Sequence, residues 1–221
     1  MPRVSSSTAD DADSNKALKL VNWIIDRAID GIPPLCSAKD LALEYQIDQS
    51  YPDDEERIEA LINWETAKNF TSGFITGLGG LLITPVSIPA ALGSSWIIQA
   101  RMSAAIAIIS GHNIQNDRVR TFVLITLLGD AAKEVLKEAG IKVATKFSAK
   151  ILEKIPGKVL IEINKKIGFR LLTKAGTRGV VNLTRMLPIA GGVVGGTFDA
   201  AACRIVGKTA KRIFCPEGTT K

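Results

Sequence analysis

Apolar side chains recur at helical spacing through most of the chain. In residues 16–30 they fall on one side of a helix, and Gly31 marks its end. Ser37, followed three residues later by an acid, predicts the start of a short second helix as a variant of the capping box. Residues 51–56 place proline and acids where a helix N-terminus favours them, so a third helix is expected to run toward Phe70.

The second half of the chain repeats this helical spacing. We expect helices over residues 117–139, with Gly140 behind, over 141–155, closed by Pro156-Gly157, and over 188–214. No Asn-Gly or Asp-Gly turn joins two alternating runs, which argues against a sheet. The pattern predicts an all-α, single-domain bundle of about seven to nine helices.

The longest uncharged stretch lies between Lys68 and Arg101 and has 32 residues. About 20 apolar residues suffice to cross a bilayer, but Pro85 and Pro89 interrupt this stretch. Arg101 falls near the middle of the downstream arm, where a charge would cost about 2.5–3.5 kcal/mol at mid-bilayer. We therefore expect a glycine- and proline-rich apolar helical hairpin over residues 69–109, either buried in protein or dipping into one leaflet.

Pairs of glycines four residues apart occur in two apolar segments. The pairs are Gly73/Gly77, Gly191/Gly195 and Gly192/Gly196. Such spacing lets two helix backbones approach closely. We expect close helix packing at these positions, in a membrane or in a tightly packed soluble bundle.

Charge is divided unevenly along the chain, which carries +6 in total. Residues 1–60 contain 13 acids and 6 bases, whereas residues 61–221 contain 9 acids and 22 bases. A basic body favours an anionic membrane or nucleic acid, or is simply a solvated face. Only 12 residues are aromatic and none alternates with the lysines, so nucleic acid is not expected as a partner.

Four lysines mark the polar side of the helix expected over residues 141–155. They are Lys142, Lys146, Lys150 and, at its flank, Lys154. Such a helix contacts anionic lipid headgroups or is an ordinary surface helix. We take these lysines as candidates for anionic surface contact.

The residues offer little for catalysis. The single histidine, His112, cannot supply a multi-histidine metal site, and Cys36, Cys203 and Cys215 show no metal or disulfide spacing. No nucleotide fingerprint is complete, so we predict no metal and no cofactor. A reducing, cytoplasmic compartment fits these cysteines, and the first 14 residues lack a secretory signal.

Three charges interrupt strongly apolar neighbourhoods: Arg101, Asp130 and Asp199. A buried charge needs a partner, so we predict that Arg101 pairs with at least one of the two aspartates between helices. The alternative is that Asp130 caps a helical restart after Gly129 and faces water.

Several short motifs in this order resemble the EcsC protein family. They include Gly73–Gly80, Gln99–Met102, Gly168–Leu172 and Pro188–Gly196, and the resemblance covers about residues 60–214. It implies a bacterial, mostly helical protein with no established catalytic residues to carry over. The family's name comes from a protein encoded beside an ABC transporter, which implies a membrane connection.

These observations favour a membrane-associated accessory protein, peripheral on the inner face of the cytoplasmic membrane. Its expected partners are the anionic membrane, a lipid, and a membrane or transporter protein. Residues 1–14 would form a flexible acidic tail, 15–59 acidic helices, 60–214 the main helical domain and 215–221 a polar tail. Alternatives are a soluble binder of lipid or another apolar small molecule, an enzyme using Asp130, Asp199 or His112, and a pore-forming toxin.

Overall fold

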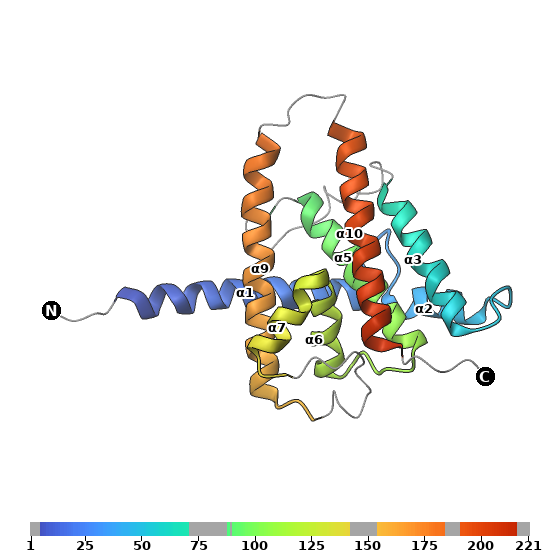
Figure 1. Cartoon of the computed structure of the whole chain (residues 1–221), viewed down its shortest axis with the longest axis horizontal. Coiled ribbons are helices and arrows are strands. Elements are labelled where there is room, and N and C mark those ends of the chain that lie inside the picture. The colour runs from blue at the N-terminus through green and yellow to red at the C-terminus, as the bar shows by residue number, and fades with distance from the viewer. Residues whose placement is uncertain (1–4, 71–87, 89, 142–153, 184–190, 216–221) are drawn as a thin grey trace.

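The computed structural model describes residues 5–70, 88, 90–141, 154–183 and 191–215. Within these residues the protein is a bundle of eight α-helices and contains no strand, as the sequence predicts (Figure 1). The helices are α1 (Ser5–Asp30), α2 (Ala38–Ile47), α3 (Asp54–Phe70), α5 (Ala90–Ile109), α6 (Asp117–Thr126), α7 (Ala132–Glu138), α9 (Gly157–Leu183) and α10 (Gly191–Phe214). A single 3₁₀ turn, η1 (Gly129–Ala131), connects α6 to α7.

The capping residues explain where the first helices begin and end. Ser37 caps α2 by accepting a hydrogen bond from the Asp40 amide, as expected. Asp53 accepts the amide of Glu56 and caps α3 in the same way. Gly31 has φ +84°, and a Cβ there would lie 2.8 Å from the Ser37 nitrogen, so the turn after α1 requires glycine.

Helix α1 begins at Ser5, eleven residues before the start that apolar spacing predicts, and it includes most of the segment expected to be a tail. Its first turns extend away from the other helices in Figure 1. Residues 11–13 and 15–16 are exposed, so no apolar periodicity marks this part. Alanine and polar residues propagate the helix there without a buried face.

Helix α5 forms the centre of the bundle. It contacts α1, α2, α3, α6 and α10, and every residue from Leu92 to Ala107 is buried. A helix that is apolar on all sides needs protein or lipid around it, and here protein surrounds it. The downstream arm of the expected hairpin is therefore a core helix, while residues 71–87 and 89 of that hairpin lie outside the described residues.

The helix expected over residues 117–139 is interrupted. Gly129 has φ +59°, which ends α6 and turns the chain through η1 into α7. A Cβ at Gly129 would lie 2.8 Å from Ile205 Cγ2, so α10 also requires a glycine here. Of the helix expected over residues 141–155, residues 142–153 lie outside the part of the chain that the structure describes.

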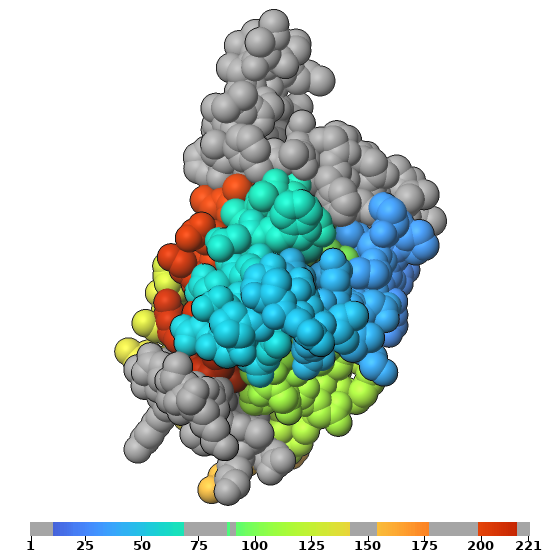
Figure 2. Space-filling model, turned by 90° about the vertical axis from the view of Figure 1, so that its right-hand side faces the viewer, coloured from blue at the N-terminus to red at the C-terminus, as the bar shows by residue number. Residues whose placement is uncertain are grey.

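One hydrophobic core includes buried residues from α1 through α10. Trp96, Phe122 and Phe214 are among its largest fully buried side chains. The acidic α2 and α3 therefore belong to the same core as the basic second half. They lie side by side on the face shown in Figure 2.

Candidate functional site

A buried ion pair joins α3 to α5. Arg101 Nη2 donates to Glu65 Oε2 at 2.9 Å; the Glu65 side chain is fully buried and that of Arg101 is 3 % exposed. Lys68 donates to the other Glu65 oxygen at 3.2 Å. Both charges of the Arg101–Glu65 pair are removed from water, so neither is stable there without the other. The pair therefore requires α3 and α5 to keep their register.

Arg101 also reaches the connection between α1 and α2. Its Nη1 lies 3.4 Å from both the carbonyl oxygen and the sulfur of Cys36. The Nε of Arg101 is buried and has no hydrogen-bond partner among the residues that the structure describes. The guanidinium thus links three parts of the chain, and the cluster is suited to holding the fold rather than to moving protons.

The predicted partners of Arg101 need correction. Its carboxylate partner is Glu65, which the sequence analysis did not select, and Asp130 is exposed on η1. Asp130 therefore faces water, as in the alternative, but it does not cap the restart, because the N-cap positions of η1 and α7 are Leu128 and Ala131. Asp199 is half-buried on α10. A signal for Glu65 existed, because it continues the apolar spacing of Ile58, Leu61 and Ile62.

The three residues of the enzyme alternative do not converge on one cleft. His112 Nε2 donates to the carbonyl of Phe214, at the end of α10, at 3.0 Å. Asp199 lies fifteen residues earlier on that helix, which corresponds to about 22 Å at 1.5 Å per residue. Asp130 is next to Gly129. Gly129 packs against Ile205, which lies on α10 between Asp199 and Phe214. The histidine is therefore a helix-end residue, and the geometry gives no support to joint catalysis.

The predicted glycine contacts fall outside what the structure describes. Gly73 and Gly77 are outside the described residues; Gly191, Gly192, Gly195 and Gly196 begin α10, but their surroundings are not described. A close helix contact is found instead at Gly168 on α9. A Cβ there would lie 2.4 Å from the carbonyl oxygen of Ala17 on α1. The sequence analysis placed Gly168 only in a family motif.

The expected basic surface is described only in part. Lys142, Lys146 and Lys150 lie outside the described residues, and Lys154 is exposed just before α9. On α9, Lys166 donates to Glu138 at 2.9 Å, and Arg170 donates to Glu134 at 3.0 Å and to Glu138 at 3.1 Å. Hydrogen bonding and the charge of Lys166 lower the pKa of Glu138. These cations are therefore partly neutralised by α7.

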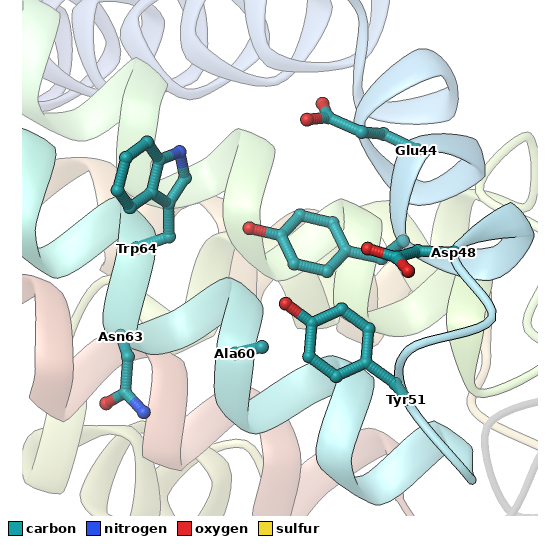
Figure 3. A pocket seen from close by; sticks show the side chains of 7 residues that line it. Glu44, Asp48, Tyr51, Ala60, Asn63 and Trp64 are labelled. Atoms are coloured by element: carbon teal, nitrogen blue, oxygen red, sulfur yellow. The ribbon is translucent and has the colours of Figure 1, made fainter.

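An open pocket lies between α2 and α3 (Figure 3). Its volume is about 500 Å³, and its lining residues are Glu44, Tyr45, Asp48, Tyr51, Ala60, Asn63 and Trp64. The rings of Tyr45 and Tyr51 stack with centroids 6.1 Å apart. Sequence reasoning missed this pocket because its residues come from separate helices. Among the described residues, no group of three or more histidine, cysteine, aspartate or glutamate side chains could hold a metal.

The fold and these sites define an all-α helical bundle with one central apolar helix and a buried ion pair. The profile of the EcsC protein family matches residues 25–215, and the chain belongs to this family. The match starts within α1 and therefore includes the acidic α2 and α3, beyond the resemblance seen over residues 60–214. No curated protein and no solved structure matched the chain.

Proposed function

We propose that this EcsC family protein is a membrane-associated accessory protein on the inner face of the cytoplasmic membrane. In this proposal one end of the bundle contacts lipid through apolar chain segments, and basic residues add attraction to anionic headgroups. A membrane or transporter protein would be its partner there. The observation that carries the proposal is the position of four helix ends.

Helices α3, α5, α9 and α10 all have an end on the same side of the bundle. Arg204 contacts Asn63 and Lys211 contacts Glu55, so α10 runs antiparallel to α3. The last turn of α3 and the first turn of α10 therefore lie at the same end. Figure 1 shows the end of α9 and the beginning of α5 at this upper end as well.

The sequences between these helix ends are strongly apolar. Residues 71–89 contain no charged residue, and residues 184–190 contain one, Arg185. Both segments connect helix ends that lie at the upper end of the bundle. Removing apolar surface from water contributes about 25 cal/mol per Å² to binding. An apolar upper end of the bundle therefore favours contact with lipid.

Helix α5 has a different role in this proposal from the one its composition suggests. Leu92–Ile109 is apolar and long enough to span a bilayer, but 94 % of this window is buried inside the bundle. Moving α5 into lipid would break the Arg101 pair and expose the core. Attachment would therefore be peripheral and would leave α5 in place.

Vesicle flotation tests the proposal. We expect the full chain to float with vesicles containing anionic lipid at low salt, and less of it to float at high salt because each basic residue near the surface adds about 1 kcal/mol. The double variant Leu81→Glu/Leu82→Glu should lose flotation. The control Ile161→Glu introduces one glutamate in place of an aliphatic side chain at a 52 % exposed position on α9 and should float like the parent chain.

Each arm has an outcome that contradicts part of the proposal. Flotation that is equal at low and high salt would remove the electrostatic contribution. A Leu81→Glu/Leu82→Glu chain that floats like the parent would remove the apolar contribution. Absence of the parent chain from every lipid fraction would refute membrane association, and salt and carbonate washes of cell membranes check the same point in cells.

A further inference from the structure

The pocket between α2 and α3 combines aromatic rings with negative charge. The aromatic part comes from three residues on two sides: Tyr45 and Tyr51 stack on the α2 side, and Trp64 borders the pocket from α3. Trp64 is 56 % exposed. Lys68 Nζ lies 5.4 Å from the Trp64 ring centroid, so this indole already accepts a cation on its surface.

Two carboxylates stand beside these rings. Glu44 and Asp48 are four residues apart at the end of α2 and both line the pocket. Within the described part of the chain, neither forms an ion pair. Asp48 accepts the Ser50 amide at 2.9 Å, and this hydrogen bond lowers the pKa of Asp48. The pocket therefore carries negative charge that the described cations leave available.

Tyr45 lines the pocket with a side chain that is mostly buried. Tyr45 is only 7 % exposed, and its hydroxyl has no hydrogen-bond partner among the described residues. In Figure 3 the hydroxyl of Tyr51 and the carboxylate of Glu44 point toward the space that Trp64 borders. Burial, then the charges of Glu65 and Glu44, raise the pKa of Tyr45, so its surroundings disfavour further negative charge.

Arg57 on α3, whose charge acts on Asp48, is already engaged. Arg57 donates to Asp54 at 2.8 Å and to the carbonyl of Tyr51 at 3.2 Å. It is not among the residues that line the pocket. Tyr51 is thus held in place by a backbone contact, and the carboxylates of α2 remain open to a ligand.

We propose that this pocket binds a small organic ammonium ion with alkyl substituents on its nitrogen. Alkylated ammonium ions are recognised by aromatic faces and are less strongly hydrated than a metal ion, so they suit rings flanked by two carboxylates. A volume of about 500 Å³ lies in the usual range for small-molecule sites. This site is independent of membrane attachment, because it lies along the middle of α3 and the end of α2, away from the upper end of the bundle.

Choline is a suitable probe, and 3,3-dimethylbutan-1-ol is its uncharged carbon analogue. We expect choline added to the full chain to shift the Trp64 indole signal in ¹H–¹⁵N NMR spectra saturably, with the signal assigned through Trp64→Phe. The neutral analogue has the same shape and should bind at least tenfold more weakly. Phosphocholine, which adds a phosphate near the two carboxylates, should also bind more weakly than choline.

Matched variants identify the contacts. Glu44→Gln and Trp64→Leu should each weaken choline binding about threefold to tenfold, which corresponds to one cation–π or charge contact. Isothermal titration calorimetry measures these affinities, because Trp64→Leu removes the indole signal. Glu162→Gln and Phe169→Leu make the same changes at exposed positions on α9 and should leave it unchanged. Circular dichroism confirms that each variant is folded.

Three results would overturn the proposal. Equal affinity for choline and its neutral analogue would show that charge is not recognised. Phosphocholine binding as tightly as choline would show that the two carboxylates do not determine the electrostatic potential of the pocket. A shift that does not saturate, or that the α9 controls reduce as much as the pocket variants, would show that no site is present.

Discussion

Replacing Glu65 with leucine would leave the Arg101 guanidinium in the core without its carboxylate. Arg101 is 3 % exposed, and its Nη2 lies 2.9 Å from Glu65 Oε2. Removing one partner of a buried ion pair typically costs about 3–5 kcal/mol, because the remaining charge is desolvated and uncompensated. Lys68 also loses a contact, but it is partly exposed and contributes little to this total. Since domains are stable by about 5–15 kcal/mol, we expect Glu65→Leu to lose a large fraction of the stability.

A double-mutant cycle separates the buried charge from lost packing. Arg101→Met should also cost about 3 kcal/mol, since it leaves the Glu65 carboxylate buried without the guanidinium. The double variant Glu65→Leu/Arg101→Met buries no charge and should cost less than either single change. Guanidinium unfolding followed by far-UV circular dichroism measures all four free energies of unfolding.

Two outcomes would refute this reasoning. A Glu65→Leu chain destabilised by less than about 1 kcal/mol would mean that Arg101 does not depend on Glu65. A double variant whose cost equals the sum of the singles would mean that the two side chains are not coupled. If Glu65→Leu is recovered only unfolded, recovery of a folded double variant supports the same conclusion.

Two further predictions concern packing and pH. Gly168→Ala should destabilise the fold by about 1–3 kcal/mol in the same unfolding assay, because its Cβ would meet the Ala17 backbone. The control Gly176→Ala, on the same helix with nothing within 4 Å of its Cβ, should instead stabilise it by about 0.5–1 kcal/mol; equal effects would contradict the contact. The raised pKa of Tyr45 contributes stability that is fully present below its ordinary value near pH 10 and is lost as pH rises toward the folded-state pKa. Urea unfolding above pH 10 should therefore lose stability less steeply in Tyr45→Phe than in the parent or in Tyr51→Phe, and parallel slopes would contradict this.

The sequence predicts the helices well because most helix ends are determined locally. Gly31 and Ser37 mark ends that depend only on backbone conformation and capping. Gly129 shows the limit of such reasoning: the apolar spacing continues across it, but the chain turns there and α10 packs against it through Ile205. A break that depends on a distant helix is not visible in the local pattern.

The candidate sites were less predictable because they depend on which helices meet. Arg101 was identified as a charge needing a partner, but its partner depends on α3 lying against α5. The pocket is a stronger case, since Tyr45 and Trp64 are ordinary helix residues until α2 and α3 pack together. Nothing in the spacing of either helix distinguishes a pocket wall from a surface.

The packing of the helices also changes what the uneven distribution of charge along the chain implies for binding. The acidic first part of the chain lies against the basic second part: Lys211 on α10 donates to Glu55 and Glu59 on α3, and Arg120 on α6 donates to Asp26 on α1. Although burial alone would lower the pKa of Lys211, hydrogen bonds to the two glutamates raise it, so Lys211 remains charged. The charge available to an anionic membrane is therefore smaller than the 22 basic residues of the second part suggest. Lys211 is in the last turn of α10, at the end opposite to the proposed lipid contact, so Glu55→Gln/Glu59→Gln should leave flotation unchanged. A clear increase in salt-sensitive flotation would contradict the placement of the upper end at the membrane.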